Sequence, residues 1–401
     1  MVGTQARYLI EGLLKTGKYS FRCFGGAIKH ADYNTIVVND DFIIKPIDGF
    51  GDQSTLRQAI ATEKPDAIFL FTDPRFFEWL LAMEDEIHNG SDKKIALLWW
   101  NIWDSRPTPK FNKWIYKSVD KLNCISYLTY QMLSEIVPER IDYVPHALPQ
   151  NIFFPIEEKQ ILEYKKQLLG KDRLDHFIGF WANRNAKRKR PNDLIWSWKL
   201  FLDKLQEKYG HKKATLILHT AARDSEGVDL FATVEYFDVQ NNVFFSQDHL
   251  EFEKINVLHN ISDFGINISL NEGHGLAITE SMYCGKPVIA LKTGGLQTQV
   301  INRETGDENG IALPVEFKTM VGSLSVPYIF EDYCSTETIA NSMLKLYDFG
   351  VEKRKELGQK ARNYAIKEFS MENTVKKWDE TFIKIIENSK EICKSWEMME
   401  I

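Results

Sequence analysis

The sequence predicts an α/β protein built on parallel sheets, and two stretches carry this prediction. Residues 263–300 read as a buried strand, a loop with two glycines, a helix and a second buried strand. Two strands joined through a helix run parallel, because a tight turn can join only antiparallel neighbours. In residues 55–100, helices alternate with the apolar strands 67–71 and 95–100 in the same way.

Length and composition agree with a globular protein of two or three domains. The chain has 401 residues, of which 44% are hydrophobic and 26% charged. Its net charge of −6 provides no general attraction to nucleic acid or to anionic lipid, so no nucleic-acid partner is expected. No apolar run approaches the ~18 residues of a membrane span, although peripheral contact with a membrane stays open.

The cysteines and the absence of a signal peptide favour a cytoplasmic protein. The five cysteines are scattered without paired spacing, which is typical of a reducing compartment and does not indicate a zinc site. They are Cys23, Cys124, Cys284, Cys334 and Cys393.

The loop within residues 263–300 has the geometry of an anion site. Ligands of open α/β sheets sit at the carboxyl ends of strands, beside helix N-termini. Here Gly273 and Gly275 flank His274, and the helix begins at Leu276 and Ala277. Free N–H groups at such a helix start favour a phosphate.

Two glutamates extend this site in opposite directions. Glu280 lies about one turn deeper on the helix face of Leu276, where its carboxylate could accept hydrogen bonds from the hydroxyls of a ribose. Glu272 lies in the loop, on the other side of the phosphates, where an attached sugar offers further hydroxyls. The alternative, two solvated carboxylates, suits an isolated pair of glutamates better than it suits this flanking pattern.

Glu272 and Glu280 are separated by seven residues within NEGHGLAITESMYCGKPVIA, which is followed by the pair Gly294 and Gly295. This segment resembles the E-x7-E motif of the family 4 retaining glycosyltransferases. Asn271 and His274 depart from the family, which usually has Gly and Phe at these places. The resemblance implies a hexosyltransferase that moves a sugar from a UDP- or GDP-linked donor to a carbohydrate, lipid-linked or protein acceptor.

The resemblance also implies the GT-B fold, in which two Rossmann-like domains face each other across a cleft. The expected domains are residues 1–150, which bind the acceptor, and 172–370, which bind the nucleotide sugar. Residues 371–401 are expected to form a terminal helix that packs back on the first domain.

The start of the chain departs from the family. Its members begin with a strand, whereas here Gly3, which resembles the glycine-rich loop near the donor phosphates, follows Met1 and Val2 directly. Either the chain starts late within a longer reading frame, or another segment fills the sheet.

A basic run follows the predicted strand 177–181. Five of the seven residues 184–190 are Arg or Lys, in a chain that is acidic as a whole, which indicates a local anion site. The resemblance implies that Arg184 and Lys189 bind the donor diphosphate and, with Glu272, form the catalytic group. A nucleic-acid patch is disfavoured because no aromatic residues are interleaved.

Polar residues also follow the strand 95–100. The resemblance makes Asp104 a candidate to contact a sugar or the acceptor, and thus a fourth catalytic candidate. An Asx-type turn that orders the loop is the alternative. His146, in the segment that closes the first domain, would lie near the crossing between domains. Residues 318–333 have no interpretation.

No D-x-D metal signature and no marked lysine context for pyridoxal phosphate occur, so no metal and no cofactor are expected. The leaving diphosphate must then be neutralised by Arg184, Lys189 and helix N-termini. Three alternatives remain: a nucleotide-sugar-binding protein without turnover, an epimerase and a phosphorylase, the latter two of the same fold.

Overall fold

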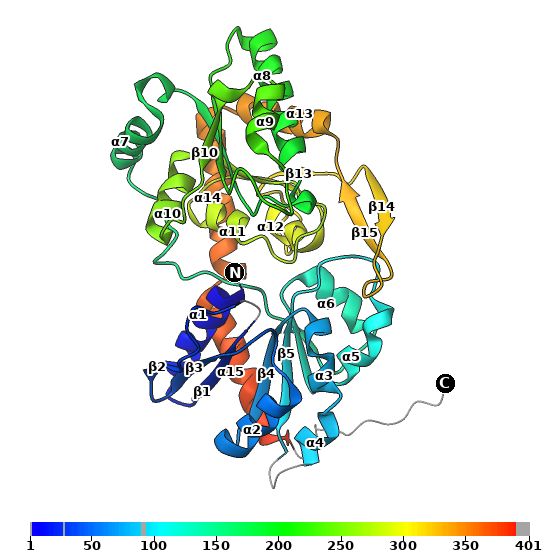
Figure 1. Cartoon of the computed structure of the whole chain (residues 1–401). Coiled ribbons are helices and arrows are strands. Elements are labelled where there is room, and N and C mark those ends of the chain that lie inside the picture. The colour runs from blue at the N-terminus through cyan, green and yellow to red at the C-terminus, as the bar shows by residue number, and fades with distance from the viewer. Residues whose placement is uncertain (1, 27–28, 90–93, 390–401) are drawn as a thin grey trace. The chain divides into compact units, whose positions relative to one another are not determined.

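The computed structural model describes residues 2–26, 29–89 and 94–389 and divides into two compact units (Figure 1). The first unit comprises the described residues within Met1–Ala147, Gly322–Pro327 and Met371–Ile401, and the second comprises Leu148–Val321 and Tyr328–Ser370. The chain passes between the units at Leu148, close to the expected boundary at residue 150. Of the expected terminal segment 371–401, residues 390–401 lie outside the described part.

The first unit contains a parallel sheet and a smaller mixed sheet. The parallel sheet has the order β4-β5-β6-β7, and the other has the order β1-β3-β2, with β1 parallel and β2 antiparallel to β3. The strands are β1 (Phe21–Gly25), β2 (Ile36–Asn39), β3 (Phe42–Pro46), β4 (Ala67–Thr72), β5 (Ala96–Asn101), β6 (Lys121–Cys124) and β7 (Ile141–Tyr143). The α-helices are α1 (Val2–Leu14), α2 (Gln53–Glu63), α3 (Glu78–Leu81), α4 (Glu84–Asn89), α5 (Lys113–Lys117), α6 (Tyr127–Ser134) and α15 (Met371–Glu387).

Strand β5 is buried on both faces, which explains its unbroken apolar run. Trp99 belongs to the apolar cluster under α3 and α5, whereas Trp100 belongs to the cluster that α1 and α15 contribute to. Trp378 of α15 packs against Trp100 with ring centroids 5.7 Å apart. The residues after 370 therefore help to complete the core of the first unit.

Gly3 lies in the first turn of α1 and not in a loop. The prediction of a glycine-rich loop there is wrong. The apolar stripe that buries Leu9 and Leu13 forms one continuous helix from Val2, and a glycine in a helix costs only about 1 kcal/mol relative to alanine.

The second unit is a six-stranded parallel sheet of order β10-β9-β8-β11-β12-β13. Its strands are β8 (Phe177–Ala182), β9 (Ala214–His219), β10 (Val243–Ser246), β11 (Phe264–Asn267), β12 (Val288–Leu291) and β13 (Gly310–Leu313). Its α-helices are α7 (Glu158–Leu169), α8 (Pro191–Tyr209), α9 (Leu230–Tyr236), α10 (Phe252–Ile261), α11 (Leu276–Tyr283), α12 (Gln297–Val300), α13 (Thr336–Asp348) and α14 (Gly350–Glu368).

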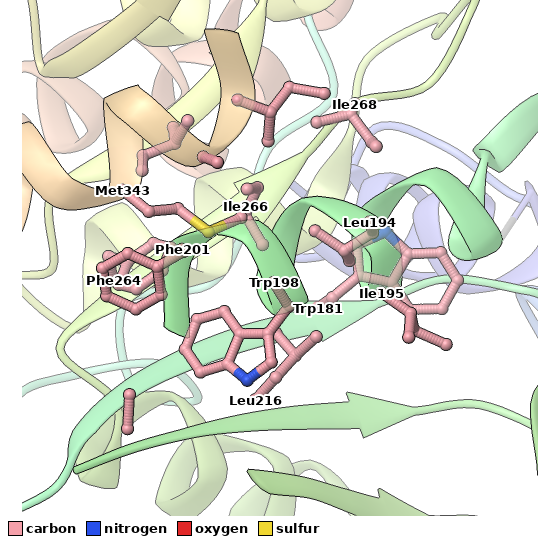
Figure 2. Packing of buried hydrophobic residues seen from close by; sticks show 14 of the residues in the cluster. Trp181, Leu194, Ile195, Trp198, Phe201, Leu216, Phe264, Ile266, Ile268 and Met343 are labelled. Carbon is pink, nitrogen blue, oxygen red and sulfur yellow. The ribbon is translucent and has the colours of Figure 1, made fainter. Parts of the chain in front are cut away.

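Helices cover both faces of this sheet because successive strand residues point to opposite faces. On one face, strand side chains such as Trp181 and Leu216 pack with α8, α9 and α13 (Figure 2). On the other face, Ile178 and Ile217 pack with residues of α7 and α10. Parallel strands buried on both faces read as apolar runs, which is why the sequence predicts them well.

Residues 317–333 form the antiparallel hairpin of β14 (Phe317–Val321) and β15 (Ile329–Tyr333). Every residue of β14 is exposed, so the segment lacks the alternation of burial that marks a strand in a sequence. The base of the hairpin is attached beside strand β11: the amide of Asp332 donates to the carbonyl of Leu270 at 3.2 Å.

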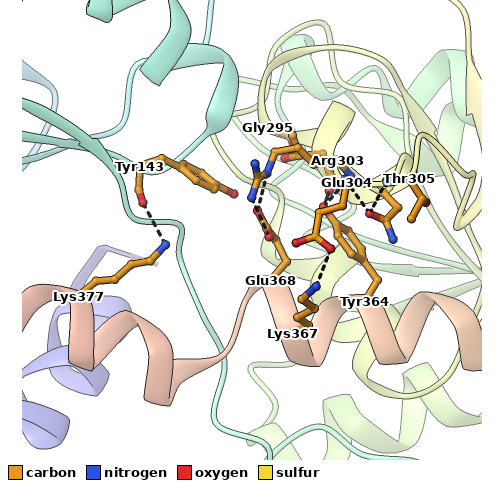
Figure 3. Close-up of polar contacts among 11 residues, drawn as sticks. Tyr143, Gly295, Arg303, Glu304, Thr305, Tyr364, Lys367, Glu368 and Lys377 are labelled. Carbon is orange, nitrogen blue, oxygen red and sulfur yellow. Dashed lines mark hydrogen bonds and ion pairs between the residues drawn. The ribbon is translucent and has the colours of Figure 1, made fainter. Parts of the chain in front are cut away.

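Ion pairs attach the last helix of the second unit, and a hydrogen bond attaches that of the first (Figure 3). In the second unit, Glu368 of α14 accepts from Arg303, and Lys367 donates to Glu304. In the first unit, Lys377 of α15 donates to the carbonyl of Tyr143 at 3.3 Å.

The first unit also buries an acidic cluster beneath β5. Glu84 Oε1 lies 3.4 Å from Nδ1 of His88, whose Nε2 lies 3.0 Å from Oδ2 of Asp120. Burial raises the pKa of Glu84 to about 7; His88 and Arg140 oppose the rise, while Asp120 and Asp85 add to it.

Glu84→Gln should therefore change how stability depends on pH. The folded-state pKa of Glu84 lies above its unfolded value of about 4.3, so its contribution to stability is present below about pH 4.3 and is lost as the pH rises towards 7. Glutamine cannot ionise, so the variant should gain on the order of 2–3 kcal/mol over wild type between pH 5 and pH 8. Melting temperatures of both proteins across this range test the prediction, and a constant difference would contradict it.

Candidate functional site

The strand order of the second unit reverses between β8 and β11, which are hydrogen-bonded neighbours. The crevice outside the carboxyl ends of two such strands is where open parallel sheets bind ligands. The basic run 184–190 follows β8, and the loop 268–275 follows β11. The fold thus brings together two segments that lie more than 80 residues apart in the chain, as the separation of 83 between Lys189 and Glu272 shows.

A buried ion pair joins these two segments. Lys189 donates from Nζ to Oε2 of Glu272, and the two side chains are only 7% and 8% exposed. Asn267 Nδ2 and Ser269 Oγ each lie 3.4 Å from the same oxygen. Sequence reasoning predicted Lys189 and Glu272 but missed the two supporting residues.

The carboxylate of Glu272 is held in its ionised form. Burial by itself would raise the pKa, but the charges of Lys189 and Arg188 and the hydrogen bonds to Lys189 and Asn267 outweigh it, so the pKa lies below its ordinary value. Glu272 therefore acts as a hydrogen-bond acceptor at neutral pH and has no proton to donate.

Arg188, which the sequence analysis did not single out, is the arginine that reaches this loop. Its Nη1 donates to the carbonyl of Asn271 at 3.0 Å, and its own carbonyl accepts from the amide of Leu270 at 2.9 Å. Its side chain is exposed, so it can contact a ligand from the solvent side.

The structure does not bring Arg184 to the loop. Its guanidinium makes a two-pronged contact with Asp224, at 2.9 and 3.0 Å, and a third contact with Glu226 at 3.0 Å. Spacing within the basic run could not reveal this, because the competing carboxylates lie 40 and 42 residues further along the chain.

The start of α11 is open to an anion, as the sequence predicts. No side chain caps the helix, and its N-cap Gly275 has φ 87°, in the left-handed region that favours glycine. Among the first residues, Leu276 is buried, whereas Gly273 and Ala277 are partly accessible. Uncapped N–H groups at this place suit a phosphate.

His274 turns its ring away from this opening. The side chain is buried, its Nε2 lies 3.2 Å from Oγ1 of Thr279, and its ring packs edge-on against Phe369. His274 was predicted to bind the donor. Its imidazole is occupied by Thr279 and Phe369, so only its backbone is left to contact a donor.

Glu280 lies one turn into α11 with 15% of its side chain exposed. Its Oε2 is 3.1 Å from Nε2 of His259, which carries the hydrogen because a carboxylate only accepts. His259 is fully enclosed, with its Nδ1 2.9 Å from Oγ of Ser281 and its ring edge-on to Phe180. This histidine fixes the carboxylate and was missed by sequence reasoning.

Gly295 packs directly against the loop 268–275. Its amide donates to the carbonyl of Glu272 at 2.8 Å, and a Cβ at this position would lie 2.3 Å from the carbonyl oxygen of Gly273. From the sequence, Gly295 was named only within the segment that carries the family resemblance.

The two remaining predicted residues, Asp104 and Gly3, belong to the first unit. Asp104 accepts from Oγ of Ser105 at 2.8 Å, as an ordered loop requires. His146 is buried, with its ring edge-on to Trp100 at 5.0 Å. The roles of Asp104 and Gly3 towards a donor stay predictions.

Within residues 2–26, 29–89 and 94–389, no group of three or more His, Cys, Asp or Glu side chains is arranged to hold a metal ion. None of the helices in the same part of the chain is both long and apolar enough to cross a membrane.

Comparisons with known proteins show similarity to glycosyltransferases. Residues 173–314 match the family Glycosyl transferases group 1. A trehalose synthase of Pyrococcus horikoshii is 32% identical over 246 residues, which are 59% of this chain and 58% of that protein. The chain thus aligns with somewhat more than half the length of this curated relative.

Solved structures show the same fold at low identity. The sucrose-phosphate synthase from Thermosynechococcus elongatus superimposes with a TM-score of 0.73 at 16% identity, over 95% of this chain and 92% of that one. Anabaena Alr3699/HepE in complex with UDP-glucose does so with a TM-score of 0.62 at 14% identity, over 85% and 86%. The resemblance to glycosyltransferases and the two-domain α/β fold are thereby confirmed, whereas membership of family 4 stays a prediction.

Gly295→Ala should loosen the loop that carries the site. The added methyl would overlap backbone atoms of Gly273 and His274, which have no flexible side chain to move aside. We expect faster hydrogen exchange of the amides of residues 272–278 and a melting temperature that is lower by several degrees, as a loss of about 1–3 kcal/mol implies.

Gly25→Ala is the matched control, because its Cβ would meet only Ile44 Cγ2 at an ordinary 3.6 Å. Equal exchange in Gly295→Ala and Gly25→Ala would show that close packing at Gly295 does not hold the loop.

Proposed function

We propose that this protein transfers a sugar from a nucleoside-diphosphate sugar to an acceptor alcohol, with retention of configuration and without a metal ion. The observation that carries the proposal is the buried pair of Lys189 and Glu272, set beside the uncapped start of α11. The match of residues 173–314 to a glycosyltransferase family supports it.

In this proposal the nucleoside diphosphate lies along α11. Glu280 accepts hydrogen bonds from the hydroxyls of the ribose, and His259 keeps its carboxylate in place. The diphosphate lies against the N–H groups at the start of the helix, between Lys189 and Arg188. Because the solved structure of Alr3699/HepE contains UDP-glucose, UDP-glucose is the first donor to test.

Glu272 orients the sugar, since an ionised carboxylate that is held by Lys189 can still accept from sugar hydroxyls. In the reaction, the bond from the acceptor oxygen to C1 forms as the bond from C1 to the phosphate oxygen breaks. The acceptor proton passes to the departing phosphate oxygen on the same face. The protein contributes orientation and fixed charges.

The acceptor is an alcohol group of a carbohydrate, a lipid-linked sugar or a protein.

The proposal places the protein in the cytoplasm. Free thiols are typical of a reducing compartment, and four cysteines are free: Cys23, Cys124, Cys284 and Cys334.

Lys189→Ala should slow the chemical step more than it weakens binding. Charge on the diphosphate grows as the glycosidic bond breaks, so a fixed cation stabilises the transition state more than the bound donor. We expect kcat for UDP-glucose, including its slow hydrolysis, to fall on the order of 10²-fold, with a smaller rise in KM. A rise in KM with kcat unchanged would contradict this role.

Glu280→Ala and Glu272→Gln separate the two glutamates. Loss of the ribose acceptor should weaken the binding of UDP itself by about 1–3 kcal/mol, whereas Glu272→Gln should spare UDP and reduce turnover. Calorimetric titration with UDP and with UDP-glucose distinguishes the two. Equal losses in both variants would show that the glutamates do not have separate roles.

Arg188→Ala and Arg184→Ala form a matched pair within one basic run. Arg188 reaches the loop, whereas Arg184 is occupied by Asp224 and Glu226, so we expect only Arg188→Ala to weaken UDP binding, by about tenfold. The reverse order would restore the prediction made from the sequence.

Incubation with UDP-glucose in the absence of acceptor tests two other activities. Release of a different UDP-sugar would identify an epimerase. Stoichiometric binding without turnover, with any acceptor tried, would identify a binding protein.

A further inference from the structure

A second candidate binding surface lies on the helical face of the second unit, where the first turns of α8 meet α9. It is a groove of about 360 Å³ whose lining includes Asn192, Asp193, Trp196, Thr233, Tyr236 and Phe237. This volume falls at the lower end of small-molecule sites, which enclose about 300–1,000 Å³.

Three aromatic rings follow one another along this groove. Trp196 and Tyr236 are 45% and 82% exposed, which is unusual for side chains of this size. The rings of Trp196 and Phe237 are nearly parallel, with centroids 6.0 Å apart, and Tyr236 meets Phe237 edge-on at 4.9 Å. The rings thus offer exposed apolar surface in a fixed arrangement.

Hydrogen-bonding groups lie beside the rings. Oγ1 of Thr233 lies 2.9 Å from Oδ1 of Asn192 and 3.0 Å from the carbonyl oxygen of Asp229, and these two acceptors share its one hydrogen, so the amide of Asn192 is linked to α9. Asp193 accepts from Nε of Arg190 at 2.7 Å, so its charge is balanced and its position fixed. Both amide and carboxylate are thereby held at the edge of the aromatic row.

This combination selects one class of ligand. No Lys or Arg is among the residues that line the groove, so it has nothing to attract nucleic acid, phosphate or anionic lipid. A sugar ring presents an apolar face of C–H groups, which packs on an aromatic ring, and equatorial hydroxyls at its edge, which both donate and accept.

We propose that this groove binds a neutral oligosaccharide, with sugar rings stacked on Trp196 and Tyr236 and their hydroxyls bonded to Asn192 and Asp193. The proposal does not rest on the proposed transfer reaction. Where that reaction acts on a glycan chain, binding in the groove would raise the effective concentration of the chain near the enzyme.

Native gel electrophoresis of the full chain through soluble starch, mixed-linkage β-glucan or galactomannan tests the proposal. Titration calorimetry with maltohexaose, cellohexaose and mannohexaose gives affinities. We expect retardation by at least one of these polysaccharides, and Trp196→Ala and Tyr236→Ala should each weaken the affinity by about tenfold. Binding of UDP, measured by thermal shift, should be unchanged in both variants.

Trp114→Ala is the matched control, since Trp114 is a similarly exposed tryptophan, at 36%, in the first unit. Thermal unfolding of each variant identifies any loss caused by misfolding. The proposal is overturned if wild type is neither retarded nor titrated by any of these saccharides. It is also overturned if a folded Trp196→Ala, Tyr236→Ala double variant binds the saccharides like wild type. The same holds if the double variant keeps its saccharide binding and loses only binding to phosphatidylcholine vesicles.

Discussion

The buried ion pair of Lys189 and Glu272 is the contact on which the candidate site depends. Each charge, if buried alone, would cost several kcal/mol, and removal of either partner from such a pair typically destabilises a protein by about 3–5 kcal/mol. The ion pair is therefore stable only when the segments after β8 and β11 pack against each other. It also holds a cation and an ionised carboxylate beside the uncapped start of α11. In the proposed function the cation suits a diphosphate, and the carboxylate suits the hydroxyls of a sugar.

The backbone around this pair is held by close packing. Gly295 carries the loop on its amide and leaves no room for a Cβ, while Gly275 takes the left-handed conformation that ends the loop and starts α11. Further along the helix, His259 is enclosed by aromatic rings and fixes Glu280. Buried neighbours thus fix the positions of the residues that would contact a ligand, and preorganised binding of charge requires such fixed positions.

Two places on the second unit differ in the residues that they gather. The carboxyl ends of the strands gather charge, whereas the groove between α8 and α9 gathers exposed aromatic rings and balanced polar groups. Arg190 connects the two in sequence, since it follows Lys189 directly and fixes Asp193 with its guanidinium.

The sequence by itself determined the parallel strands and the glycine-flanked start of α11, because these depend on local patterns: buried apolar runs and glycines. It also singled out Lys189 and Glu272, but their ion pair joins segments 83 residues apart and was decided by the fold. The expectation of a loop at Gly3 was wrong, whereas Arg184 is paired with Asp224 and Glu226 and its role towards a diphosphate stays a prediction. Only the tertiary structure decided which arginine reaches the loop, that His259 holds Glu280, and that residues 317–333 form a hairpin. Those outcomes depend on partners tens of residues away, and on competition between Asp224, Glu226 and the loop for one guanidinium, which no local spacing encodes.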